Sequence, residues 1–168
     1  MDRRGVIAAV AVLALALAGV GTKMAVDAAR PKGTDQEQIA RMLVQGEAAV
    51  ERKDVPGVTR FISDDYRDGL GFSSSSVKYQ IGDYLHRKGA LELNIPSRSV
   101  EIIVNPDGLT ASARFHVSAI AASPNGSNQT EMDITLQLKK EKVYYYLLFP
   151  GQEWKVTSAE GYGGLEGL

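Results

Sequence analysis

The spacing of apolar residues changes once along this chain, from a helical period to strict alternation. Between residues 35 and 89 apolar side chains recur at intervals of three and four, which is the period of an amphipathic helix. From residue 100 onward they alternate with polar side chains, which is the period of a strand buried on one face. Helices and strands segregated in this way predict an α+β fold, with the helices packed against one face of an antiparallel sheet.

Three helices are expected in the first half of the folded part. Thr34 and Glu37 form a capping box, so the first helix should run over residues 35–53. Asp54 can cap a short second helix, and a third should end near Gly89, which suits a helix stop. The expected core positions on these helices are Ile39, Met42, Leu43, Gly46, Ala49, Val50, Val55, Val58, Phe61, Ile62, Val77, Ile81, Tyr84 and Leu85.

Four or five antiparallel strands are expected in the second half. The sequences NPDG at 105–108 and SPNG at 123–126 are hairpin-turn signals. The run VYYYLLF at 143–149 is apolar at every position, so it should form a strand covered on both sides or lying at an interface. Gly151 should then begin the last turn. The expected core-facing strand positions are Val100, Ile102, Val104, Ala111, Ala113, Phe115, Val117, Ala119, Met132, Ile134, Leu136, Leu138, Trp154 and Val156.

The chain opens with an uncharged apolar run over residues 5–21, preceded by Arg3 and Arg4. Such a segment is typical of a signal peptide and is also just long enough for a membrane helix, so a retained anchor and a cleaved peptide both stay open. The preceding arginines favour a domain outside a bacterial inner membrane, crossed by a single segment; if the segment is cleaved, the domain is periplasmic or secreted. The expected organisation is a signal peptide or anchor helix over 1–22, a linker over 23–33, an α+β domain over 34–160 and a flexible tail over 161–168.

Composition excludes several classes of function. The 168 residues contain no cysteine, which excludes disulfides, thiolate metal sites, cysteine nucleophiles and a lipoprotein anchor. Residues 1–32 carry a net charge of +3 and the remainder −4, and an acidic domain without a basic run is a poor nucleic-acid binder. His86 and His116 are far apart and have no ligand at a short spacing, so neither a metal nor a cofactor is expected.

Four short motifs, in this order and spacing, carry a resemblance to a known family. They are EAAVERKD at 47–54, VTRF at 58–61, SDDY at 63–66, and EWKV at 153–156. Together they resemble the nuclear transport factor 2-like superfamily over residues 35–158. The resemblance implies a cone-shaped α+β fold, with three helices on a curved, mostly antiparallel sheet, a pocket at the mouth, and often a homodimer formed through the sheet.

Members of this superfamily include ketosteroid isomerases, polyketide cyclases, dehydratases and many noncatalytic binding modules, so the fold does not settle the function. Within it, YRDGLG at 66–71 resembles a group of small bacterial exported proteins of unassigned function. The implied partners are a small apolar ligand or a partner protein, the inner membrane through the N-terminal helix, and a second copy of the chain.

The candidate chemistry centres on one acidic residue. Abstraction of a proton beside a carbonyl group requires a carboxylate base in an apolar pocket and a donor for the oxyanion. The resemblance places Asp68 about where the isomerases carry their base, and Tyr66, Tyr84 and His116 are the candidate partners. It also places Gly46 where the isomerases carry a tyrosine donor, which counts against their mechanism. Alternatively, Asp68 structures its loop by accepting hydrogen bonds from nearby amides.

Three interpretations follow. The preferred one is a membrane-anchored or exported noncatalytic module that binds a small apolar ligand or a partner protein. The second is an isomerase- or cyclase-like enzyme acting on a small apolar carbonyl compound. The third is a structural subunit of a membrane assembly, which would expose apolar residues such as Tyr144 and Tyr146. The surroundings of Asp68 should discriminate between the first two.

Overall fold

Among the residues that the structure describes, three helices precede five strands, so the predicted α+β order is confirmed. The computed structural model describes residues 33–87, 91–94, 96, 99–123, 126–145 and 149–162. The expected apolar helix near the N-terminus lies outside these residues, and none of the helices within them is long and apolar enough to cross a membrane. The elements are α2 (Asp35–Glu51), α3 (Val55–Thr59), α4 (Ser74–Arg87), β1 (Leu91–Asn94), β2 (Glu101–Val104), β3 (Thr110–Ser123), β4 (Gly126–Tyr145) and β5 (Phe149–Tyr162).

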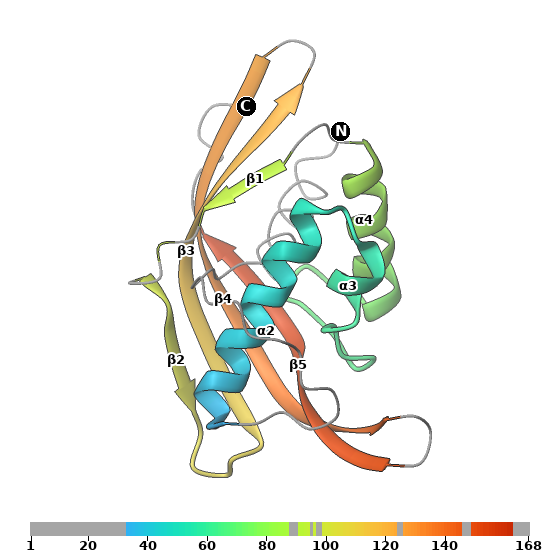
Figure 1. Cartoon of the computed structure of the whole chain (residues 1–168), viewed down its shortest axis with the longest axis vertical. Coiled ribbons are helices and arrows are strands. Elements are labelled where there is room, and N and C mark those ends of the chain that lie inside the picture. Colours follow the sequence, from blue (N-terminus) through green and yellow to red (C-terminus); the bar gives the residue numbers. More distant parts are fainter. Residues whose placement is uncertain are drawn as a thin grey trace.

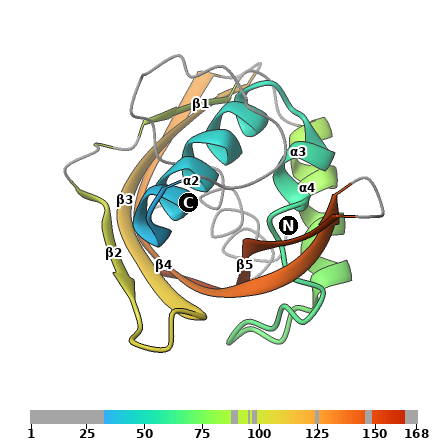
Figure 2. The ribbon, with the colours of Figure 1, turned by 60° about the horizontal axis from the view of Figure 1, so that its bottom comes forward.

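The five strands form one curved antiparallel sheet. Its order is β1-β3-β4-β5, and β2 pairs with β3 further along the same edge as β1. β3 pairs with β4 from Thr110 to Ser123, and β4 pairs with β5 along most of its length. The sheet wraps around α2, while α3 and α4 lie beside that helix (Figure 1, Figure 2). The expected hairpin at 105–108 is confirmed, since β2 and β3 pair on either side of it.

The start of α2 is fixed both locally and against the sheet. The predicted capping box is present: the Glu37 amide donates to the Thr34 hydroxyl, and the Thr34 amide donates to the Glu37 carboxylate. The Asp35 carboxylate lies 2.7 Å from the Lys140 ammonium and accepts a 3.4 Å hydrogen bond from the Trp154 indole. Lys140 and Trp154 are paired residues of β4 and β5, and the ammonium lies over the indole ring. This junction ties the first turn of α2 to the last two strands.

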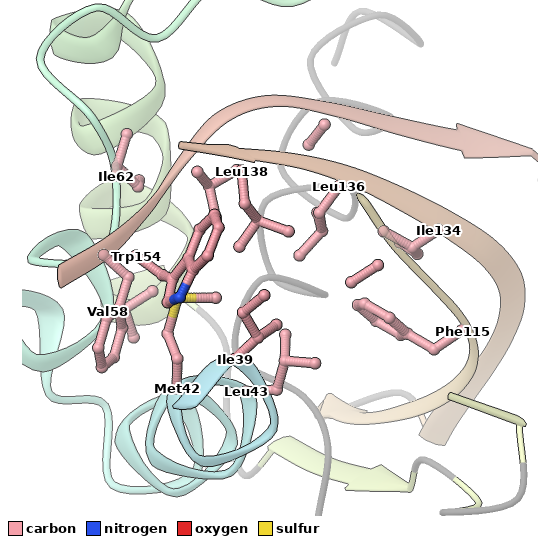
Figure 3. Close-up of a cluster of buried hydrophobic side chains, with 14 of the residues drawn as sticks. Ile39, Met42, Leu43, Val58, Ile62, Phe115, Ile134, Leu136, Leu138 and Trp154 are labelled. Carbon is pink, nitrogen blue, oxygen red and sulfur yellow. The ribbon is translucent and has the colours of Figure 1, made fainter. Parts of the chain in front are cut away.

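The core lies between α2 and the concave face of the sheet (Figure 3). Alternate residues of β3 and β4 face the helix, as the period of two predicts, and Phe115 and Leu136 are among the most deeply buried. The intervening residues, Arg114 and Gln137 among them, lie on the outer face. All the predicted core positions belong to the core or pack against it.

The prediction of a separate strand over 143–149 is wrong. β4 continues to Tyr145, and its pairing with β5 passes without a break through the polar residues 139–142. Tyr145 pairs with Phe149, so the chain reverses between them, and Gly151 lies inside β5 opposite Val143 instead of beginning a turn. The polar residues 139–142 therefore do not end the strand, because their backbones pair with β5.

Two further differences concern the ends of elements. β1, which pairs with residues 118–121 of β3, was not predicted, because its four residues are too few to show a period. β5 ends at Tyr162, two residues beyond the expected domain end at 160. The rest of the expected tail lies outside the described residues.

Substitutions at two neighbouring positions of β4 should differ greatly in their effect on the free energy of unfolding. Leu136 is fully buried, whereas Gln137 is exposed on the outer face. Leu136→Ala should lower the free energy of unfolding by about 2–5 kcal/mol, because it removes buried methyl groups and leaves a cavity. Gln137→Ala should change it by less than about 0.5 kcal/mol. Urea unfolding followed by Trp154 fluorescence measures both, and equal losses would contradict this packing.

Candidate functional site

Asp68 lies in the loop between α3 and α4, and both of its carboxylate oxygens are engaged there. One oxygen accepts hydrogen bonds from the amides of Leu70 (3.0 Å) and Phe72 (2.8 Å). The other accepts a hydrogen bond of 3.3 Å from the Tyr66 hydroxyl. The loop turns through Gly71, whose φ of +86° suits a residue without Cβ. The carboxylate therefore holds the loop closed around itself.

Tyr66 is the buried partner of this loop, with 1% of its surface exposed. Burial, and then the charge of Asp68, raise the pKa of Tyr66 above its usual range. The hydroxyl therefore keeps its proton and serves as a hydrogen-bond donor to the carboxylate. The structure thus brings together two of the four candidate residues, and it does so as a structural pair.

The loop is attached to the free edge of β5 by backbone hydrogen bonds. The Ser63 amide donates to the Val156 carbonyl (2.9 Å), and the Val156 amide donates to the Phe61 carbonyl (2.8 Å). The Arg67 amide donates to the Thr157 carbonyl at 2.9 Å. These bonds cover part of the sheet edge and fix Tyr66 and Asp68 beside β5.

The other two candidates lie on other elements, Tyr84 on α4 and His116 on β3. Tyr84 is half-buried on α4, packs against the core, and has a pKa raised by burial. His116 alternates along β3 with buried Phe115 and Val117, so it faces the outer side of the sheet. There its ring lies 3.1 Å from a carboxylate oxygen of Asp133. His116 therefore does not meet the Tyr66–Asp68 pair, which belongs to the helix side.

Glu47 is the titratable group that sequence reasoning missed. It follows Gly46 on α2 and is half-buried. Burial, and then the negative charge of Glu51 one turn later, raise the pKa of Glu47 to about 7. A carboxyl group that titrates near neutrality suits general acid–base chemistry. The available signal was the like-charge pair at i and i+4 near a helix C-terminus, where the helix dipole also disfavours anions.

Two polar atoms on α4 complete the inventory. Ser74 Oγ and Gln80 Oε1 are buried and have no hydrogen-bond partner among the described residues. Buried polar atoms of this kind are available to water or to a ligand. Within the same part of the chain, no three His, Asp or Glu side chains are placed to hold a metal ion together.

Comparison with solved structures places this architecture among known folds. A nuclear transport factor 2-like superfamily protein from Salmonella enterica superposes with a TM-score of 0.59 at 13% identity, covering 79% of this chain and 93% of that one. A presumed dehydratase of the same family from Streptomyces avermitilis gives 0.58 at 13% identity, covering 76% and 94%. The chain has a nuclear transport factor 2-like fold. The expected resemblance is confirmed at the level of the fold.

A third structure, Bd1075 from Bdellovibrio bacteriovorus, gives a TM-score of 0.60 at 11% identity. The match covers 76% of this chain but only 41% of Bd1075, so this chain spans less than half of that protein. No family model matches the sequence, and no curated protein does. At these identities the superpositions establish a shared nuclear transport factor 2-like fold. They do not establish a shared activity.

The Asp68 loop predicts a large stability effect from a single carboxylate. Asp68→Ala should lower the free energy of unfolding by about 2–4 kcal/mol, because two amides and the buried Tyr66 hydroxyl lose their acceptor. Asp64→Ala is the matched control: this neighbouring carboxylate is exposed and pairs only with Lys78, so it should change stability very little. Urea unfolding measures both. Equal effects would show that Asp68 does not hold the loop.

Glu47 predicts a pH-dependent stability. Because its pKa is raised from 4.5 to about 7 in the folded state, folding disfavours its charged form. Stability should therefore fall as pH rises from about 4.5 to 7 and stay lowered above that range. Glu47→Gln should raise the free energy of unfolding on the order of 1 kcal/mol at about pH 8, allowing for solvent screening, and hardly at all at about pH 4.

Chemical denaturation at both pH values measures this effect, with Asp65→Asn as an exposed control. An equal gain for Glu47→Gln at both pH values would rule out titration of Glu47 as its cause.

Proposed function

We propose that this chain is a noncatalytic binding and interaction module, held outside a bacterial inner membrane by residues 1–22. The state of Asp68 carries this proposal. A general base must present an oxygen to the substrate within about 3 Å. Both oxygens of Asp68 instead bind the loop that contains them, to Leu70, Phe72 and Tyr66.

An isomerase also needs a hydrogen-bond donor for the oxyanion, and the position where the family carries this donor lacks one here. Gly46 occupies the position of the family's tyrosine and has no side chain to donate. Tyr66 is engaged with Asp68, and His116 faces the other side of the sheet. The residues that the family would use for proton transfer are thus either absent or occupied.

The ligand we propose is a small, largely apolar compound or an apolar segment of a partner protein. Ligand sites are mostly apolar and carry a few placed polar groups. On α4, Ser74 Oγ and Gln80 Oε1 are buried polar atoms without a hydrogen-bond partner among the described residues, so they are available to orient such a ligand.

We also propose a homodimer formed through the outer face of the sheet. Along β4 this face carries Glu131 and Asp133 on one side of Thr135 and Lys139 on the other. Two copies packed face to face with β4 antiparallel would place the acidic part of one opposite the lysine of the other. A two-fold interface of this kind is electrostatically self-complementary.

An isomerase- or cyclase-like enzyme acting on a small apolar carbonyl compound is the second candidate. The observation that favours it is Glu47, whose pKa of about 7 is suited to proton transfer in a partly buried site. The superposed Streptomyces avermitilis protein, presumed to be a dehydratase, supports the idea that a protein with this fold can be an enzyme.

Two variants separate the candidates. The full chain should show no turnover of cyclic ketones and enones, and neither Glu47→Gln nor Asp68→Asn should alter the binding of such compounds, measured by Trp154 fluorescence. Turnover that Glu47→Gln abolishes and Asp68→Asn preserves would establish the enzyme and replace the module.

The anchor predicts that the full chain stays with the membrane fraction after an alkaline carbonate wash. Deletion of residues 2–22 should move the protein to the soluble fraction, because the apolar run supplies the attachment. Protease added to the outside of spheroplasts should degrade the domain. Release of the full chain by carbonate would contradict a retained anchor.

A further inference from the structure

The far end of the β4–β5 hairpin extends beyond the body of the domain. Lys140 and Trp154 contact the first turn of α2 through Asp35, and the next residue, Glu141, accepts a hydrogen bond from Ser63. Beyond them the two strands stay paired as far as Tyr145 and Phe149. Figure 1 shows this end projecting past the helices at the lower right. We call its two arms, residues 142–145 and 149–152, the distal hairpin.

The distal hairpin combines apolar and aromatic residues with lysine. The sequence VYYYLLF at 143–149 contains no charged residue. Tyr144 is 67% exposed, and Lys142 beside it is exposed as well. Tyr144 is thus an exposed aromatic side chain on a projecting hairpin, within a sequence that is uncharged from 143 to 149, and this combination suits an interaction site.

The start of the domain lies at the same end. Asp35, in the first turn of α2, binds Lys140 and Trp154 at the base of the distal hairpin. From Lys140 to Tyr144 the strand covers only about 14 Å. The linker over residues 23–33 spans at most ~40 Å even when fully extended. A membrane that holds residues 5–21 is therefore kept within reach of the distal hairpin.

We infer that the distal hairpin docks on the surface of the lipid bilayer; this inference rests on the proposed anchor. Tyrosine favours the membrane interface, where its ring is apolar and its hydroxyl stays hydrated. Lys142, on the same strand face as Tyr144, extends its charge to anionic headgroups. The inward-facing backbone groups of the two arms are paired with each other. At the level of the headgroups the outward-facing groups stay hydrated.

A bilayer fits this surface better than a second copy of the hairpin does. The Lys142 side chains of two hairpins in contact would repel each other, whereas lipid phosphates attract them. The tether also holds the domain beside lipid at all times, which raises the effective concentration of that surface.

The absence of native cysteine allows single labels to be placed cleanly. Gln152, which pairs with Lys142, and Gln129, near the opposite end of β4, are both exposed. Each is replaced by cysteine in the full chain and labelled with an environment-sensitive fluorophore. The chains are reconstituted in vesicles of phosphatidylcholine with a minority of phosphatidylglycerol, carrying a spin-labelled lipid as quencher. The label at 152 should shift to the blue and be quenched several-fold more than the label at 129.

Variants of the distal hairpin should reduce this difference in quenching between the two labels. Tyr144→Ser should reduce the quenching at 152, whereas Tyr79→Ser, at a 75% exposed tyrosine on α4, should not. Lys142→Gln should lower the ratio of docked to free hairpin about fivefold in the anionic vesicles, and hardly at all in phosphatidylcholine alone.

Flotation of the same vesicles reports on the anchor separately. A chain that floats with the vesicles but shows equal quenching at 152 and 129 overturns the docking inference and leaves the anchor standing. A blue shift at 152 that the lipid quencher does not touch, and that grows with protein concentration, means that a second copy covers the hairpin and also overturns the inference. A chain that does not float overturns the anchor, and quenching at 152 in that chain still supports docking.

Discussion

The structure depends on one contact, between the apolar face of α2 and the concave face of the sheet. A curved antiparallel sheet exposes one apolar face, and a single helix fills it here because Ile39, Leu43 and their neighbours meet the alternating residues of β3 and β4. The junction of Asp35 with Lys140 and Trp154 fixes where along the strands that helix begins. Once α2 is placed, the outer face carries mainly polar residues, with Ile103 and Ile120 exposed among them. The helices α3 and α4 lie beside α2, and the loop that carries Asp68 reaches the edge of β5.

Local pattern was sufficient wherever the period was long enough to read. The capping box at Thr34 and the alternation on β3 give the correct elements and the correct faces, and the same alternation implies that His116 lies outside, between Phe115 and Val117. Pattern was insufficient where pairing decides the structure. β1 has too few residues to show a period, and β4 continues through polar residues because β5 pairs with them. Glu47 was missed for a related reason: its raised pKa comes from desolvation, which only tertiary packing creates.

The candidate site shows how one residue type can serve structure or chemistry but rarely both. A carboxylate that accepts two amides and a buried hydroxyl, as Asp68 does, is held in one orientation with both oxygens engaged. Those bonds would have to break before it could take a proton from a substrate. Glu47 is in the opposite condition, since its charge is disfavoured by burial and by Glu51. If this fold performs acid–base chemistry, Glu47 on α2 is therefore better suited to it than Asp68 in the loop.

The long β4–β5 hairpin connects the fold to the proposed attachment. Its proximal part belongs to the core, where Leu136 and Trp154 are buried, and its distal part leaves the core while its strands remain paired. A strand pair that leaves the body gains no burial from the domain, so apolar residues there are stabilised only by something outside it. A tether that enters beside Lys140 and an apolar hairpin at the same end would give two points of attachment to one surface. Two points restrict the rotation that a single flexible linker allows, so the concave side of the sheet would be held at a constant orientation to the membrane.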